Sequence, residues 1–407
     1  MVLLAEISIK TALQILQILT QIAAAHGVRI FLVGGPVRDL VMYQTKLNLD
    51  KIDLDIAVEN RYYEIGLALA KKIKASMTNY PQFMTMTLQL NQSRRIDIAQ
   101  TRQEHYPRPA ALPKVNPALI YDDLARRDFT INAMAIEITP DFLNCKKYLI
   151  LDPFSGQIDI KNKLIRILHP KSFIDDPTRI FRAIRFAYRF NFQLEYQTKY
   201  LLLEAIRNNH LQLLSGERIL YELQKIIQEK KNVEILKALN QYQIFKKLYH
   251  TYLPTKFFAE QKLLSQELKL IHLFFYLPIK KWQHYPLSKS ITENVKALHN
   301  FYKIKPNLIK IKKPSYIYKT LNCFPDLSLK ILRCLESKTI SNKIKSFQTK
   351  YRQVKVFTDG KTLQSLQIKP GPIYSQILSE LKLLKLDGVI KNKSDEIEYI
   401  KQKYRNV

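Results

Sequence analysis

The stretch of residues 52–58 alternates apolar and acidic side chains, a period of two that predicts a β-strand. Residues two positions apart on a strand point to the same face, so Asp53 and Asp55 project side by side while the apolar residues between them face a core. Paired carboxylates suit Mg²⁺, which proteins hold with one or two carboxylates together with substrate phosphates. The alternation therefore predicts a metal-binding strand, with the solvated face of an edge strand as the simpler alternative.

The chain has 407 residues, of which 46% are hydrophobic, so we expect a globular protein of roughly two to four domains. No apolar run reaches transmembrane length, and residues 1–9 lack the basic and apolar segments of a leader. The three cysteines form no Cys-x-x-Cys pair, which favours a reducing compartment over a disulfide framework or a zinc site. These features predict the bacterial cytosol, or the plastid stroma if the protein is encoded within the organelle, and no membrane attachment.

A formal net charge of +30 favours a polyanionic partner such as a nucleic acid. The alternative is compositional: the chain is rich in Lys, Ile, Asn and Tyr and has only 9 glycines, as expected of an AT-rich genome. Mutational bias in such a genome also produces lysines. The charge therefore favours a nucleic acid without identifying one.

Two adjacent glycines, Gly34 and Gly35, follow a predicted helix over 10–26 and a predicted buried strand over 30–33. Glycines let the backbone approach a ligand closely, and their N–H groups can cradle phosphate. Arg38 adds a planar donor fork that matches phosphate oxygens. We therefore expect this turn to hold a triphosphate and the paired-aspartate strand to hold its metal.

Two further strands are predicted over 83–90 and 94–99, and the second of them carries Asp97 between two isoleucines. Asp97 is either a third carboxylate for the metal site or a partner that orients Arg38 or Arg102. The sequence pattern does not decide between these roles.

Residues 103–120 contain four prolines and are expected to form a loop. The following residues, 122–135, are expected to form a charged corner that enters a buried helix. Arg127 can reach phosphate, and Asp128 and Asn132, four apart on one helix face, can hydrogen-bond a ribose. The alternative is a helix N-terminus with an aspartate cap and solvated arginines.

These motifs together resemble those of the class II tRNA nucleotidyltransferases, which add CCA to tRNA 3′ ends, and of the bacterial poly(A) polymerases in the same class. The matching segments are 34–39, 53–55, 126–133 and 152–157. The resemblance implies an α+β protein, with an N-terminal nucleotidyltransferase-fold mixed α/β head that has a small β-sheet, followed by an all-helical neck, body and tail. It implies domains at 1–165 (catalytic head), 166–230 (neck with a base-reading helix) and 231–407 (body and tail, binding tRNA).

Residues 173–186 predict a helix that begins beside Asp176, and Arg179, Arg182 and Arg185 recur along it every three residues. The simplest interpretation is a basic surface stripe that binds RNA without specificity. The alternative is that Asp176 and Arg179 read the base of an incoming nucleotide, as the resemblance implies. Arg182 and Arg185 would then assist at the phosphates or orient their neighbours.

Donor and acceptor chemistry supports the base-reading interpretation. A carboxylate only accepts hydrogen bonds and a guanidinium only donates them. Cytosine and adenine each present an amino donor beside a ring-nitrogen acceptor, whereas uracil and guanine present a carbonyl beside an N–H. Asp176 and Arg179 would then select CTP and ATP without a template, by about 10⁴-fold. The family usually has Glu-Asp where this chain has Asp175 and Asp176, so the first acid is shorter here.

Residues 215–225 resemble the family's next motif and are expected to form a capped structural helix with ion pairs along its own face. Residues 230–350 predict helices without a chemical constellation, and His272 is expected to lie in a core. The segments 358–363, 368–372 and 386–388 resemble the family's C-terminal signature, in which Gln367 replaces a glycine. Pro-Gly-Pro at 370–372 is expected to open a helix whose N–H groups suit a phosphate backbone.

The sequence thus predicts a Mg²⁺-dependent tRNA nucleotidyltransferase that adds C and A from CTP and ATP to the tRNA 3′ end by a two-metal mechanism, with no protein partner implied. Asp53 and Asp55 are the expected metal ligands and, with Asp97, the catalytic carboxylates. The expected nucleotide-binding residues are Gly34, Gly35, Arg38, Arg127, Asp128, Asn132, Asp176, Arg179, Arg182 and Arg185.

Other functions stay open at this stage. The nearest is a partial enzyme that adds only A or only CC, and the next is a poly(A) polymerase, although residues 132–135 look more like the tRNA enzymes. A noncatalytic RNA-binding protein would have no reason to keep two adjacent charges. A nuclease-type phosphodiesterase would use paired acids but would not need a base-reading helix.

Overall fold

The computed structural model describes residues 11–43, 53–91, 94–140, 149–278, 280 and 284–404. The chain divides into two compact units, Met1–His250 and Thr251–Val407. The expectations for residues 1–9 and for Cys145 lie outside the described residues. Within the described part, no helix is both long and apolar enough to cross a membrane.

The first unit contains a mixed seven-stranded sheet in the order β3-β4-β5-β2-β1-β8-β9. Its strands are β1 (Ile30–Val33), β2 (Leu54–Val58), β3 (Ser76–Tyr80), β4 (Thr85–Gln89), β5 (Arg95–Gln100), β8 (Ala135–Glu137) and β9 (Ile150–Leu151). Strands β2 and β5 run parallel, and the other neighbours are antiparallel. The parallel pair places Asp55 directly beside Asp97.

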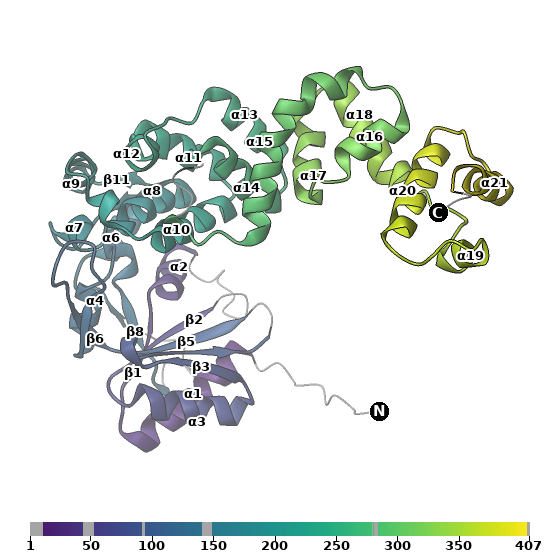
Figure 1. Cartoon of the computed structure of the whole chain (residues 1–407). Helices are drawn as coiled ribbons and strands as arrows, with labels where there is room; N and C mark the ends of the chain where they lie inside the picture. Colours follow the sequence, from purple (N-terminus) through teal and green to yellow (C-terminus); the bar gives the residue numbers. More distant parts are fainter. Residues whose placement is uncertain are drawn as a thin grey trace. The chain divides into compact units, whose positions relative to one another are not determined.

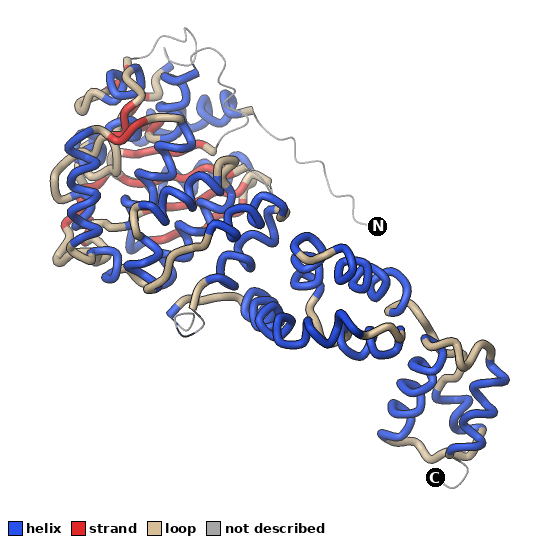
Figure 2. Tube along the Cα trace, turned by 90° about the horizontal axis from the view of Figure 1, so that it is seen from above, coloured by secondary structure: helices blue, strands red, loops and turns tan. Residues whose placement is uncertain are grey.

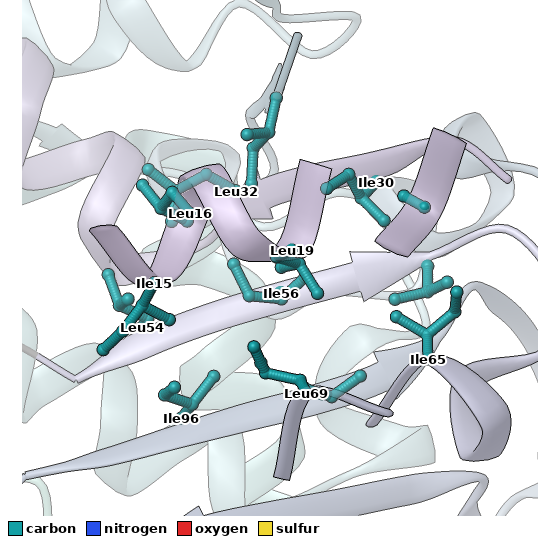
Figure 3. Close-up of a cluster of buried hydrophobic side chains, with 14 of the residues drawn as sticks. Ile15, Leu16, Leu19, Ile30, Leu32, Leu54, Ile56, Ile65, Leu69 and Ile96 are labelled. Carbon is teal, nitrogen blue, oxygen red and sulfur yellow. The ribbon is translucent and has the colours of Figure 1, made fainter. Parts of the chain in front are cut away.

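One face of this sheet is covered by α1 (Ala12–His26) and α3 (Tyr62–Ile73) (Figure 1). Figure 3 shows Ile15 and Leu19 of α1 and Leu69 of α3 packed against Leu54 and Ile56 of β2. Burial of Leu54 and Ile56 fixes the strand's register, because a slip by one residue would put Asp55 in the core. The helix predicted over 10–26 and the apolar side of the aspartate strand are therefore confirmed.

Two predictions in the head are wrong. Residues 103–120 are not a loop throughout, because β6 (Arg102–His105) and β7 (Lys114–Pro117) form a separate two-stranded sheet. Of the prolines, three lie in the connection and one ends an edge strand, where a missing N–H is tolerated.

The buried helix expected within 122–135 is also wrong. Helix α4 (Ile120–Ala125) ends before the arginines, a single 3₁₀ turn covers Thr130–Asn132, and the apolar residues that follow enter β8. A short apolar run does not distinguish a buried strand from a buried helix, and here the sheet is its partner. The strand predicted from residue 83 begins only at Thr85, because Pro81–Phe83 form another 3₁₀ turn.

The rest of the first unit is helical apart from a short parallel pair, β10 (Leu164–Ile165) with β11 (Gln193–Leu194). The helices are α2 (Gly35–Tyr43), α6 (Gly156–Lys161), α7 (Ser172–Asp175), α8 (Thr178–Phe190), α9 (Tyr196–Arg207), α10 (Gly216–Gln228), α11 (Asn232–Gln241) and α12 (Ile244–Tyr249). Asp176 stands before α8, where its Oδ1 accepts the N–H of Thr178 at 2.9 Å. The predicted start of this helix is confirmed.

The described residues of the second unit form helices joined by loops, with no strand among them (Figure 2, blue and tan). Its helices are α13 (Thr255–Leu263), α14 (Gln266–Tyr276), α15 (Lys289–Lys310), α16 (Pro314–Leu321), α17 (Asp326–Leu335), α18 (Lys338–Ser346), α19 (Gly360–Ser365), α20 (Pro372–Leu386) and α21 (Lys393–Lys403). His272 is fully buried, as predicted for a core histidine. Gln367 adopts φ 63°, in the left-handed region that glycine favours, so this position has a conformation that a glycine would adopt with less strain.

The architecture is α+β, as predicted. The domain boundaries at 165/166 and 230/231 stay predictions.

Candidate active site

A cavity of about 1060 Å³ opens in the first unit between residues of the sheet, α2, α8 and α10. Asp55 and all of the predicted nucleotide-binding residues line it, although they come from segments more than a hundred residues apart. Asp53 and Asp97 are not among the lining residues. The fold therefore gathers nearly every residue that the motifs singled out into one cavity.

Asp55 is the carboxylate that reaches this cavity. In the part of the chain that the structure describes, no hydrogen bond or ion pair reaches its oxygens. Burial, reinforced by the neighbouring Asp97, raises the pKa of Asp55 to about 6. A half-buried carboxylate without a partner favours a proton or a cation, so Asp55 is poised to bind one.

Asp53 and Asp97 are held by the strand beside them. The backbone N–H of Arg95 donates to Asp53 Oδ1 at 3.2 Å, and Arg95 Nε lies 3.4 Å from Asp53 Oδ2 and 3.1 Å from Asp97 Oδ2. The Thr87 hydroxyl donates to Asp97 Oδ1 at 2.6 Å. Among the described residues Asp97 orients neither Arg38 nor Arg102, so that alternative is wrong.

The donor set fits a divalent cation held partly by substrate. No group of three or more His, Cys, Asp or Glu side chains is arranged to hold a metal by itself within the described residues. Asp55 nevertheless offers unpaired hard oxygen donors, and Asp97 stands beside it in register. Such a site suits Mg²⁺, which is commonly bound by one or two carboxylates plus phosphate oxygens.

The glycine turn lies against this carboxylate. Gly34 has φ 69°, so a side chain there would be strained, and its Cβ would lie 2.9 Å from Arg127 Nη1 and displace that guanidinium. The Gly34 N–H donates to the Met134 carbonyl at 3.4 Å. Helix α2 begins at Gly35, and a Cβ on this glycine would lie 3.9 Å from Asp55 Oδ2, so the start of the helix lies beside the carboxylate.

A chain of hydrogen bonds joins the head to α8. Arg38 Nη1 donates to Asn132 Oδ1 at 2.7 Å, Asn132 Nδ2 donates to Asp128 Oδ1 at 2.9 Å, and Arg182 Nε donates to Asp128 Oδ2 at 2.8 Å. Burial raises the pKa of Asp128, but Arg182 and Asn132 outweigh it and bring the pKa to about 2. Asp128 and Asn132 thus contact each other although no helix carries them.

The aromatic side chain of Phe186 lies beneath this chain. Its ring centroid is 5.8 Å from the guanidinium carbon of Arg38, 5.3 Å from that of Arg182 and 4.7 Å from that of Arg185. Phe129 packs edge-on against the same ring. One buried ring therefore positions three of the predicted phosphate-binding arginines.

The predicted base readers lie at the start of α8. Arg179 is 4% exposed, and it donates from Nη1 to Ser172 Oγ and from Nη2 to the Arg126 carbonyl, both at 2.7 Å. Asp176 Oδ1 accepts from Arg218 Nη2 at 2.6 Å. Contacts within the chain thus hold both side chains in place.

The surface-stripe interpretation of α8 is wrong. Arg179 and Arg185 are buried, and Arg185 Nη1 lies 3.3 Å from Glu229 while its Nη2 lies 3.7 Å from Glu222. The expectation was that α10 would form ion pairs along its own face. Glu222 and Glu229 instead pair with Arg185 of α8. Arg179 and Arg185 therefore line the cavity and are not part of an exposed basic surface.

The alternative of solvated arginines before residue 128 is also wrong. Arg126 and Arg127 both pair with Asp123, which is 1% exposed. Arg126 also donates to Glu104 at 2.8 Å. In the described part of the chain the buried Nε of Arg127 has no hydrogen-bond partner, which leaves a donor for a ligand.

Sequence reasoning missed Arg218, which holds Asp176, and Glu104, which holds Arg126. Arg218 lies in the segment 215–225, which resembles a motif of the family. The sequence pattern of this segment predicts only a structural helix, so Arg218 was not predicted to be part of the site. Glu104 carried no signal, because its segment was expected to be a loop.

Two family models match the chain. One, described as "Poly A polymerase head domain", matches residues 30–166, and the other, described as "Probable RNA and SrmB- binding site of polymerase A", matches residues 191–252. The first match lies within the first unit, and the second begins there and ends at residue 252, just past its boundary.

Curated relatives extend the similarity to nearly the whole chain. An A-adding tRNA nucleotidyltransferase of Halalkalibacterium halodurans is 30% identical over 402 residues, covering 96% of this chain and 92% of that protein. An A-adding tRNA nucleotidyltransferase of Aquifex aeolicus is 33% identical over 81% of this chain, which spans only 41% of that protein.

Solved structures share the fold. A CCA-adding enzyme in an apo form has a TM-score of 0.75 and 29% identity, over 95% of each chain. Structures of a CCA-adding enzyme with ATP (TM-score 0.74) and with CTP (0.73) are each 26% identical, over 96% and 97% of this chain and 95% of theirs. The Thermotoga maritima CCA-adding enzyme with tRNA has a TM-score of 0.69 and 26% identity, over 96% and 95% of the two chains.

Proposed function

The chain belongs to the family of tRNA nucleotidyltransferases and poly(A) polymerases, and from that premise we propose that it adds C and A from CTP and ATP to the 3′ end of tRNA. The observation that carries the proposal is the single cavity in which the unpaired Asp55, the arginines of α8 and the Asp176–Arg179 pair converge. Nucleotide transfer needs a carboxylate that binds a cation, donors that bind phosphate, and an acceptor beside a donor that binds the base.

Addition of A alone is the second candidate. The two relatives compared above, one of them similar along nearly its whole length, are named A-adding enzymes. The similar structures are CCA-adding enzymes, which supports the full reaction. Poly(A) polymerase is less favoured, because the relatives similar along most of the chain are tRNA enzymes.

We assign the metal-binding role to Asp53 and Asp55, with Asp97 as a third carboxylate, and Mg²⁺ as the metal. Bound Mg²⁺ would lower the pKa of the attacking 3′-hydroxyl and offset the charge of the triphosphate. Asp55 has no hydrogen-bond or ion-pair partner among the described residues, whereas Asp53 and Asp97 lie 3.4 Å and 3.1 Å from Arg95 Nε.

The arginines around Phe186 hold the triphosphate in this proposal. Arg38 and Arg182 are already fixed by Asn132 and Asp128, so little side-chain freedom is lost when phosphate binds. Arg127 adds its unpaired Nε. Gly34 and Gly35 leave room for the phosphates beside Asp55.

Asp128 and Asn132 are assigned to the ribose. Asp128 already accepts from the N–H of Phe129, from Asn132 and from both nitrogens of Arg182 that face it. These donors fill about four lone-pair sites, so a ribose hydroxyl binds by replacing one of them.

Asp176 and Arg179 are assigned to the base. Arg218 and Ser172 hold them in place, and a rigid acceptor beside a rigid donor matches cytosine and adenine and clashes with uracil and guanine. The shorter Asp175 lies 4.0 Å from His169 Nδ1, so it has a contact of its own.

The basic neck, body and tail (166–230 and 231–407 as predicted) bind the tRNA backbone in this proposal, with an affinity that falls steeply as salt rises. The Thermotoga maritima neighbour with bound tRNA supports this partner. The bacterial relatives support the bacterial cytosol as the compartment.

The test is nucleotide incorporation on three tRNA transcripts, one ending before CCA, one ending in CC and one complete. Each receives CTP, ATP or both, with Mg²⁺. Growth of the first transcript to a CCA end, without extension of the complete one, is the expected result. Extension of the CC transcript alone indicates an A-adding enzyme, and addition that stops at CC indicates a CC-adding one. Long A tails on any RNA indicate a poly(A) polymerase, and no incorporation contradicts the proposal.

A further inference from the structure

One face of α10 lines the cavity beyond the base readers. Arg218, Tyr221, Lys225 and Gln228 follow one another at intervals of three and four residues, so they share that face. Arg218, the first of them, ion-pairs with Asp176. The helical turns that follow therefore continue away from the place where the incoming base is read.

Tyr221 stands out on this face because 54% of it is exposed although it lines a cavity. Lys225 Nζ lies 5.2 Å from the centroid of the tyrosine ring. An open aromatic face accepts a nucleobase by stacking, and an ammonium group beside it suits a phosphate. The pair has the chemistry of a binding site for a single nucleotide.

The cavity is large enough to hold a second nucleotide beside the incoming one. Its volume of about 1060 Å³ lies at the upper limit of the roughly 300–1,000 Å³ that one small-molecule ligand fills. The proposed reaction joins an incoming nucleotide to the last nucleotide of an RNA, so both must be held in one cavity. The residues assigned above account for the incoming nucleotide and leave the RNA end without a site.

We propose that Tyr221 and Lys225 bind the 3′-terminal nucleotide of the RNA, with Tyr221 stacked on its base and Lys225 paired with its phosphate. The inference rests on the proposed function. Stacking tolerates any base, because every base has a π-face. An end whose last base changes as nucleotides are added therefore keeps one binding site, while hydrogen bonds read only the incoming base.

The first test is the Tyr221→Ala variant. We expect its KM for a tRNA transcript to rise about 10-fold, while its KM for ATP and its melting temperature stay unchanged, because the side chain is exposed. Tyr221→Phe keeps the ring and should restore the KM for tRNA. Tyr121→Ala is the matched control, since Tyr121 is 56% exposed on α4 and does not line the cavity.

The second test changes the RNA. On a transcript whose last nucleotide keeps its ribose hydroxyls but lacks its base, the wild-type protein should lose about 10-fold in KM, and Tyr221→Ala should lose nothing further. An additional loss in Tyr221→Ala on that transcript would overturn the stacking contact.

The two proposals fail in different ways. If the wild-type protein transfers no nucleotide, the proposed function is wrong. If it transfers nucleotides and Tyr221→Ala keeps the wild-type KM for tRNA, only the site at Tyr221 is wrong.

Discussion

Asp55 in the cavity of the first unit differs from Glu380 and Glu396 in the second unit, because the described part of the chain gives no partner to the first and several to the other two. In the second unit Glu380 accepts hydrogen bonds from Tyr399 at 2.7 Å and Tyr404 at 2.6 Å, and also from Lys403. Glu396, which is fully buried, accepts two backbone N–H groups. In the cavity, by contrast, no hydrogen bond or ion pair within the described residues reaches Asp55.

The pKa values of the two carboxyl groups record the same difference. Burial raises the pKa of Glu380, but the donors around it outweigh burial and bring the pKa down to about 2. The pKa of Asp55 is raised to about 6 by burial and by Asp97. The donors around Glu380 thus stabilise its charged form within the fold, whereas the oxygens of Asp55 are available to a ligand.

Among the substitutions that test this comparison, the largest effect on nucleotide transfer is expected at the paired aspartates, Asp53 and Asp55. Asp53→Ala should lower nucleotide transfer by more than about 10³-fold, because the metal loses a ligand. Binding of tRNA, measured by filter retention, should persist, since the basic surface is unchanged. Loss of tRNA binding together with activity would make this strand structural.

Base selection should be the next largest effect. Arg179→Lys keeps the charge but loses the planar donor fork, so discrimination against UTP and GTP should fall by about 10²-fold or more. The measurement is kcat/KM for each of the four nucleotides. Arg166→Lys, outside the cavity, is the control and should keep wild-type selection. Unchanged selection in Arg179→Lys would remove Arg179 from the base site.

A smaller effect is expected at the aromatic ring beneath the arginines. Phe186→Met preserves much of the volume but removes the π-face under three guanidinium groups, so the KM for ATP should rise about 5-fold. Phe181→Met is the matched control, because Phe181 is fully buried on the same helix and no arginine stacks on it within the described residues. Equal KM values in the two variants would assign Phe186 to packing alone.

The smallest effect is expected in the second unit, and it concerns stability. Glu380→Gln should lower the free energy of unfolding by about 1–3 kcal/mol at pH 7 and leave kcat unchanged. Because the folded protein depresses the pKa of Glu380, its contribution is present above the ordinary value of 4.5 and is lost as the pH falls toward 2. Melting temperatures of wild type and variant should therefore converge over that pH range, and a constant difference would contradict the assignment.

Much of the fold was predictable because its patterns are local. The alternation around Asp55 and the capped helix over 10–26 needed only their own residues. The strand β8 was not predictable in this way, because a short apolar run forms a strand only when a sheet is present to pair with it. The hairpin β6–β7 was hidden by its prolines, which lie in the turn and at an edge.

The site was predictable residue by residue but not in its arrangement. The resemblance named Asp128, Arg179 and Arg182, yet the pattern of α8 alone reads as a surface stripe. Burial of that stripe depends on Glu222 and Glu229, some forty residues further along the chain. Contacts of that kind are made by the tertiary fold, so the sequence pattern does not contain them.

The most direct test of the role of Asp55 compares the melting temperature and the nucleotide transfer of the Asp55→Asn variant with those of the wild type. Removing a half-buried charge that has no hydrogen-bond or ion-pair partner among the described residues should leave the melting temperature equal to or above that of the wild type, while nucleotide transfer falls by more than about 10³-fold. A variant that melts well below the wild type and retains transfer would contradict the account, because Asp55 would then serve the fold, as Glu380 does.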